Sequence, residues 1–218
     1  FVKKCDERSM SDPMVNIHFL TILREDEFRE LKKDFPHDNE LLHSIRSIRY
    51  CKAEVFRDCI LGTLRVPEKN EIRTPHVVFG FYLTDKELFL IEDSGELKHW
   101  IEKKEEQFQE LKSPDQVLLK MMELMIENDL LYLLHLEKEI EKMEDQLIKG
   151  VPDNFFSVLT KYRQKLSELD AYYEQLAMIG DLLQSQDGLT IIHNTESWNR
   201  YALRKERLHN HVHLLREN

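Results

Sequence analysis

The sequence predicts an α+β protein, in which an α/β/α layer with a mixed, largely antiparallel sheet is followed by long antiparallel helices and one further helix. Only six Gly and six Pro occur among 218 residues, which favours long helices with few turns. Strand-like segments are confined to the part before Gly95, and apolar residues after it recur at alternating spacings of three and four. The predicted boundaries are 1–112 for the α/β layer, 113–187 for the long helical pair and 188–218 for the start of the last helix.

The chain is predicted to open with one strand and two helices. Residues 14–23 are rich in β-branched and aromatic side chains, which favours a strand. Helices are expected over about 25–33 and 38–48, separated by Pro36.

Three further strands are expected before Gly95. Residues 53–66 form one long apolar segment that Pro67 ends, so a single strand is predicted there. Residues 76–92 contain two apolar runs separated by Thr84-Asp85-Lys86, a pattern typical of a hairpin. Gly80 inside the first run indicates a bulge or the close approach of another backbone.

Helical periodicity dominates the rest of the chain. A helix is predicted over 97–111, and the next begins with Ser113 as N-cap and Pro114 at its first position. Residues 115–149 then keep a regular apolar stripe that would be about 50 Å long if unbroken. Only Asp129 interrupts that stripe with a charge.

Two more apolar stripes follow. A Gly-Val-Pro segment near residue 150 separates the first stripe from one over 155–183, so these two helices should run antiparallel. A third stripe runs over 191–215 and is still in register where the sequence stops. Two interpretations remain open: a three-helix bundle, or a third helix that protrudes and packs against copies of itself.

Charge and cysteine content exclude several classes of protein. A formal net charge of −10 argues against nucleic-acid binding, which requires clustered Lys and Arg. Cys5, Cys51 and Cys59 lack CxxC spacing, so idle, buried thiols are favoured over a disulfide framework or a thiolate zinc site. The apolar run 130–134 is too short to cross a bilayer, and an opening Phe is consistent with a trimmed or excised fragment.

Charge is distributed unevenly along the chain. Residues 92–149 contain 16 Asp/Glu and 8 Lys/Arg, whereas 196–218 contain five Lys/Arg and three Glu. Such a run is usually a solvated face, but an acidic helix also concentrates hydrated divalent cations.

Histidines are the only candidate metal ligands with a suggestive spacing. His209 and His213 are four residues apart and share one helix face, a spacing that can bind Zn²⁺, whereas His211 points elsewhere. Because no Cys and no further carboxylate cluster lies nearby in sequence, a polar outer helix face is the favoured interpretation. Three E-x-x-H pairs, typical of di-iron bundles, fall in unrelated contexts: Glu40/His43, Glu96/His99 and Glu206/His209.

No catalytic motif is present. The sequence contains no G-x-S-x-G, Walker, GxGxxG or HExxH segment, so no enzymatic function and no required cofactor are predicted.

Several segments resemble the cytoplasmic part of the CorA family of divalent-cation transporters. "KAEVFRDCILGTLRVP" (52–67) is similar to a strand of that family, "YLLHLEKEIEKMEDQLIKG" (132–150) resembles its acidic antiparallel helix, and "LRKERLHNHVHLLREN" (203–218) resembles its stalk helix. The Gly-Met-Asn loop of the family is absent from the sequence. The resemblance implies that the last helix continues into a membrane span, so a chain without the span would be cut within the stalk.

The resemblance also implies a function and its residues. Family members conduct Mg²⁺ or related ions passively through a homopentamer in the cell membrane, gated by a cytoplasmic funnel. Ions bound between subunits favour closure, which places Glu68 in the sensing role, with Glu196 as the nearest partner carboxylate. Arg200 stands where the family has the partner acid, so an ion pair with Glu68 could replace the metal. The 191–215 stripe would be the part that bundles around the fivefold axis.

Three alternatives stay open at this stage. Related family members handle Zn²⁺, and the His-bearing stalk suits that ion. A soluble helical scaffold, whose third helix pairs with another protein, would also produce these stripes. A His/carboxylate metalloenzyme would contain stoichiometric Zn or Fe.

Overall fold

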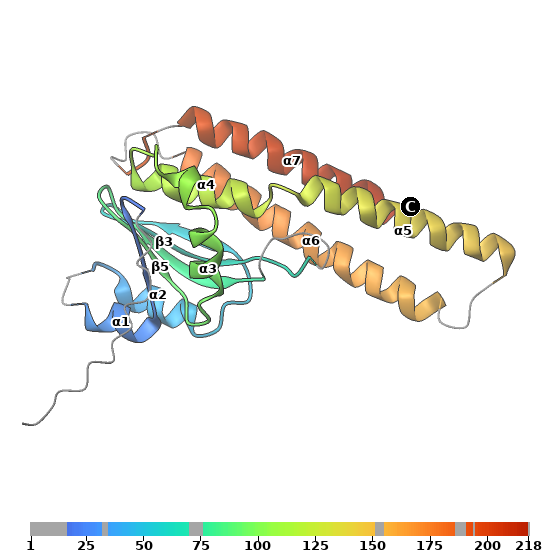
Figure 1. Cartoon of the computed structure of the whole chain (residues 1–218), viewed down its shortest axis with the longest axis horizontal. Coiled ribbons are helices and arrows are strands. Elements are labelled where there is room, and N and C mark those ends of the chain that lie inside the picture. The colour runs from blue at the N-terminus through green and yellow to red at the C-terminus, as the bar shows by residue number, and fades with distance from the viewer. Residues whose placement is uncertain are drawn as a thin grey trace, which may run out of the picture.

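The computed structural model describes residues 17–31, 35–69, 76–150, 155–185, 191–193 and 195–217. A five-stranded sheet lies at the centre of the N-terminal part, in the order β1-β5-β4-β3-β2 (Figure 1). β1 pairs with β5 in parallel, and every other neighbouring pair is antiparallel, which confirms the predicted mixed, largely antiparallel sheet. The strands are β1 (Leu20–Leu23), β2 (Lys52–Val55), β3 (Ile60–Arg65), β4 (Val78–Leu83) and β5 (Leu88–Ile91).

The prediction of one long strand over 53–66 is wrong. This segment is a hairpin in which β2 and β3 pair antiparallel, and Phe56 N–H donates to the carbonyl of Cys59 at 2.8 Å. The adjacent charged residues Arg57 and Asp58 occupy the turn, where both stay exposed. Two neighbouring charges cannot both point to solvent from the middle of a buried strand, so the chain reverses there.

The second hairpin confirms its prediction, but Gly80 does not form a bulge. Thr84 links β4 to β5, and its Oγ1 accepts hydrogen bonds from the backbone of Lys86 and Glu87. The β3–β4 register runs unbroken through Gly80. A Cβ atom on Gly80 would lie 2.6 Å from Cγ1 of Ile45, so the close neighbour is a helix side chain rather than another backbone.

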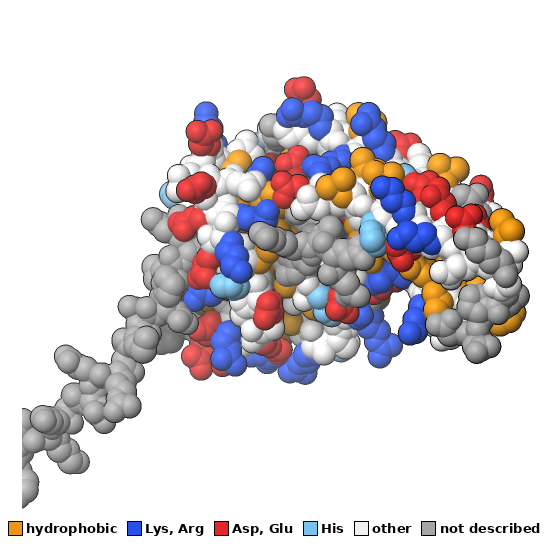
Figure 2. Space-filling model, turned by 45° about the vertical axis from the view of Figure 1, so that its right-hand side comes forward, with side chains coloured by type: hydrophobic (Ala, Val, Ile, Leu, Met, Phe, Trp, Pro, Cys, Tyr) orange, Lys and Arg blue, Asp and Glu red, His pale blue; other side chains and the backbone are white. Residues whose placement is uncertain are grey.

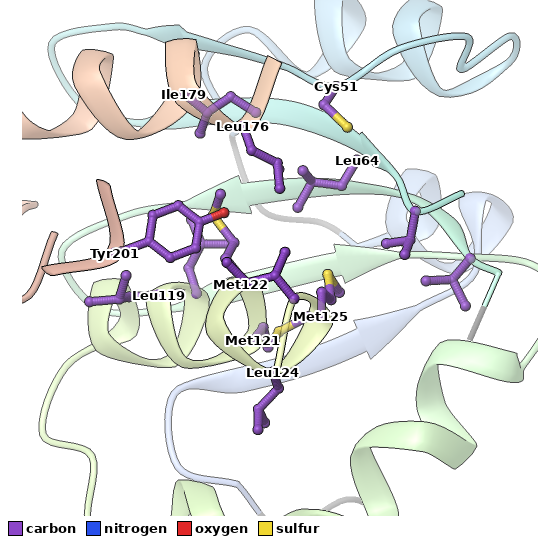
Figure 3. Packing of buried hydrophobic residues seen from close by; sticks show 14 of the residues in the cluster. Cys51, Leu64, Leu119, Met121, Met122, Leu124, Met125, Leu176, Ile179 and Tyr201 are labelled. Carbon is purple, nitrogen blue, oxygen red and sulfur yellow. The ribbon is translucent and has the colours of Figure 1, made fainter. Parts of the chain in front are cut away.

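Helices cover both faces of the sheet. α1 (Glu25–Glu30) and α2 (Asp38–Ile45) pack on one face, and both are shorter than predicted. The other face packs against the long helices, and Figure 3 shows side chains of β3, α6 and α7 around Met121, Met122 and Met125. The predicted helix over 97–111 consists of α3 (Glu96–Glu102) followed by a short 3-10 helix, Glu105–Phe108.

The predicted 115–149 helix is broken. α4 (Pro114–Met125) begins at the expected N-cap and proline, and three residues separate its end from the start of α5 (Asp129–Lys149). The Met125 carbonyl accepts a hydrogen bond from Lys69 Nζ at 3.3 Å, whereas Asp129 N–H donates to the Ile126 carbonyl. A side chain from a distant loop therefore stands where the helical hydrogen bond of Asp129 would form.

The last two helices pack against one another over the part of α6 that follows about residue 166 (Figure 1). α6 (Phe155–Gln184) runs antiparallel to α5, as predicted, and α7 (Thr195–Glu217) runs back along α6. The expectation that the apolar stripe of α7 packs against other copies of the chain is wrong. The side chains of the stripe are 4% exposed or less within one chain: Trp198, Tyr201, Leu208, Val212 and Leu215. The three-helix bundle is the arrangement that the described residues adopt.

None of the described helices combines the length and apolar character needed to cross a membrane. The division into segments 1–112, 113–187 and 188–218 stays a prediction. One hydrophobic cluster contains residues of the sheet and of α4 to α7 together.

Both described cysteines are free and buried, as expected, and Cys5 lies outside the described residues. Burial raises the pKa of the Cys51 thiol from 9.0 to about 11. Below about pH 9 the thiol is protonated in the folded and the unfolded chain, so its contribution to stability is fully present. That contribution is lost as the pH rises towards about 11.

We therefore expect slow thiol chemistry in the folded protein. In a Cys5→Ser variant, Ellman's reagent below about pH 9 should find no fast-reacting thiol until denaturant is added. A rapid reaction of either remaining cysteine in the absence of denaturant would contradict the buried placement.

Candidate regulatory site and its anchoring ion pair

Glu68 lies in the segment that follows β3 and Pro67, and it is exposed. Its backbone carbonyl accepts a hydrogen bond from Lys165 Nζ of α6 at 2.6 Å. The same ammonium group donates to Glu168 Oε2 at 2.9 Å. The main chain at Glu68 is therefore attached to α6, while the residue itself faces solvent.

The next residue, Lys69, is fully buried in an ion pair that was not predicted from the sequence. Its Nζ lies 2.6 Å from both carboxylate oxygens of Asp129, and both side chains are 0% exposed. Tyr173 of α6 donates its hydroxyl to Asp129 Oδ2 at 2.9 Å. The Lys69 ammonium group also lies over the ring of Tyr172, and Nζ is 5.1 Å from the ring centroid. The loop after β3, the start of α5 and the middle of α6 are thus joined at one point.

The electrostatics of this pair are governed by burial. Burial lowers the pKa of Lys69, and the negative charge of Asp129 opposes that shift. Burial likewise raises the pKa of Asp129, opposed by Lys69 and by the Tyr173 hydrogen bond. Each charge alone would be costly in this interior, so the two groups depend on one another. The only sequence signal was the charge of Asp129 within an apolar stripe.

Glu196 lies in the first turn of α7 and is exposed. Arg200, one turn later, donates from Nη2 to Ser197 Oγ at 3.1 Å. Glu68 lies beside Lys165 of α6, which contacts its carbonyl. From Lys165, α6 continues for about 30 Å to its end at Gln184, and α7 begins near that end. One chain therefore does not bring Glu68 and Glu196 together, and a contact between subunits stays a prediction.

A sequence model of the family described as "CorA-like Mg2+ transporter protein" matches residues 17–218. The chain belongs to the CorA family. The match includes the sheet, α4 to α6 and the whole of α7, so the resemblance drawn from three short segments is confirmed over nearly the full length.

Several solved structures share this fold. The CorA magnesium transporter from Methanocaldococcus jannaschii has a TM-score of 0.69 at 19% identity, over 99% of this chain and 70% of that chain. Its soluble domain has a TM-score of 0.63 at 16% identity, over 83% and 80%. The ZntB cytoplasmic domain from Vibrio parahaemolyticus has a TM-score of 0.59 at 12% identity, over 96% and 89%. No curated protein matches the chain.

The histidines of this CorA-family chain have partners that the sequence did not reveal. His209 and His213 share one face of α7, as predicted, and that face meets Asp170 of α6. His211 points away from them, and its Nε2 lies 3.6 Å from Glu137 of α5. Asp170 is 39 residues before His209, so only the packing of the two helices could have disclosed the group.

The E-x-x-H pairs do not assemble into one site. They lie on α2, α3 and α7, and in the described part of the chain the group Asp170, His209 and His213 is the one set of three potential ligands that converge. A di-iron centre built from these pairs therefore has no support in the described residues.

Proposed function

We propose that this chain is the regulatory part of a divalent-cation transporter, and that it gates passive conduction of Mg²⁺ from the cytoplasmic side of the cell membrane. The observation that carries this proposal is the family match over residues 17–218. A chain in this role needs no cofactor and catalyses no reaction. The ion is both the transported species and the regulator.

The proposal includes assembly into a homopentamer and attachment to the membrane through spans that would follow residue 218. Since the α7 stripe is covered by its own chain, copies would meet through other surfaces. Support comes from large exposed apolar residues: Leu130 of α5 and Leu203 of α7, 50% and 58% exposed, line one groove. The groove combines these apolar side chains with Arg200, Arg204 and Arg207, and such a mixed surface suits contact with another copy.

The proposed sensing carboxylates are Glu68 and Glu196, contributed by neighbouring subunits. Both are exposed, Glu68 in the segment after β3 and Glu196 in the first turn of α7, so each can reach a surface that another copy approaches. Nucleic acid is not proposed as a partner, because Figure 2 shows acidic and basic side chains interspersed on the face it presents.

A zinc-transporting protein of the same family is the second candidate. It is favoured by the histidines of α7 and by the fold shared with the ZntB cytoplasmic domain. A soluble helical scaffold remains the competing class.

The test begins with the gene. The encoded sequence after Asn218 should contain two apolar spans joined by Gly-Met-Asn, whereas a stop codon close to Asn218 would overturn the proposal. The full-length protein in liposomes should then admit Mg²⁺ down its gradient without ATP. Glu68→Ala and Glu196→Ala should stay open at Mg²⁺ concentrations that close the wild type. Glu141→Ala, an exposed carboxylate of α5, is the matched control and should close normally.

A further inference from the structure

Three side chains converge where the C-terminal half of α7 crosses α6. Oδ1 of Asp170 lies 3.1 Å from Nε2 of His209 and 3.5 Å from Nε2 of His213. One potential ligand atom from each residue lies within 4.8 Å of the other two. The two imidazole rings are 4.7 Å apart and inclined by 65°, so they converge on the carboxylate without stacking.

These separations fit the coordination shell of a tetrahedral ion. Nitrogen and oxygen ligands bind Zn²⁺ at about 2.0–2.1 Å, so two ligand atoms of one tetrahedron are about 3.3–3.4 Å apart. The two distances from Oδ1 lie on either side of that value. Small rotamer adjustments of His209 and His213 would therefore complete three corners, and the fourth corner can hold water.

The carboxylate oxygen itself needs a positive partner. Oδ1 of Asp170 is buried and accepts no well-formed hydrogen bond from the described residues, although two imidazole nitrogens are close. A buried carboxylate oxygen in this state is costly unless a cation or a donor compensates it. The imidazole nitrogens can supply a proton or share a metal ion with it.

Arg216 contacts the other oxygen of the same carboxylate, Oδ2. That contact fixes the orientation of Asp170 and leaves Oδ1 directed at the histidines, as an outer hydrogen bond does for many metal ligands. The Arg216 side chain is 41% exposed, so solvent screens its repulsion of a bound cation. The remaining histidine of the segment, His211, faces α5 and cannot join the group.

We propose that Asp170, His209 and His213 form a Zn²⁺ site that clamps α7 to α6. Two imidazoles and one carboxylate select a borderline ion such as Zn²⁺ over Mg²⁺, which prefers oxygen ligands and retains its water. The site is built within a single chain, so it does not depend on the proposed transport function or on assembly with other copies.

The test is a calorimetric titration of Zn²⁺ into the full 218-residue chain, with Co²⁺ absorbance as a report of tetrahedral geometry. We expect one Zn²⁺ per chain, no displacement by excess Mg²⁺, and a rise in melting temperature on Zn²⁺ addition because the clamp exists only in the folded state. His213→Ala, at a side chain that is 52% exposed, should fold normally and bind at least about tenfold more weakly. Asp170→Asn should weaken binding in the same way.

His211→Ala is the matched control, because it removes an imidazole from the same helical segment and should leave the affinity unchanged. Absence of saturable binding at one ion per chain would overturn the proposal. So would equal weakening by His211→Ala, which would indicate nonspecific binding to surface histidines. Neither result would alter the expected outcome of the liposome assay.

Discussion

Asp129→Ala is expected to destabilise the chain by about 3–5 kcal/mol, because it leaves the ammonium group of Lys69 buried without its counter-charge. The Tyr173 hydroxyl loses its acceptor in the same substitution. Urea unfolding followed by circular dichroism measures this loss directly. Since Lys69 adjoins Glu68, the same variant should also loosen the segment that carries the proposed sensing carboxylate.

Two further variants separate charge compensation from simple packing. A Lys69→Met, Asp129→Leu double variant removes both charges and should recover most of the stability lost in Asp129→Ala. Glu139→Gln removes one partner of an exposed ion pair with Lys142 on the same helix and should produce no measurable change. If the double variant proved as unstable as the single one, the pair would matter for its hydrogen-bond geometry rather than its charge.

The helices and strands that could be predicted are those whose own residues carry the signal, in the spacing of their buried apolar side chains or in their capping and turn residues. The β4–β5 hairpin, the α4 start at Ser113-Pro114 and the antiparallel α5 and α6 each carry local signals of this kind. The break after Met125 could not be predicted, because Lys69, which binds its carbonyl, lies 56 positions earlier in the chain. The hairpin at Arg57-Asp58 was missed because the apolar run on both sides conceals a two-residue turn.

The candidate metal site likewise has one part that could be predicted from the sequence and one part that could not. The i, i+4 spacing of His209 and His213 predicts a shared face, but the spacing does not say which residue of another helix that face meets. Asp170 becomes a neighbour only through the register of α6 against α7. The expected role of the α7 stripe failed for a related reason: a heptad pattern requires a partner helix, but it does not specify whether that helix belongs to the same chain.

Trp198→Ala tests that last point, and it is expected to cost about 3–5 kcal/mol of unfolding free energy, since the indole is 0% exposed within one chain. The loss should be the same at low and high protein concentration, because the partner surface belongs to the same molecule. Trp198→Phe should retain most of the stability, because the buried Nε1 donates no hydrogen bond to any described residue.

Leu203→Ala is the matched substitution on the same helix, at a side chain that is 58% exposed. It should leave the unfolding free energy nearly unchanged and, if copies meet through the groove shared with Leu130, weaken self-association measured by sedimentation. If Trp198→Ala instead produced a stable monomer that no longer associates, the stripe that contains Trp198 would lie between chains. Because burial within one chain and burial between chains predict opposite responses from these two positions, the pair of variants decides which face of α7 is available to a neighbouring subunit.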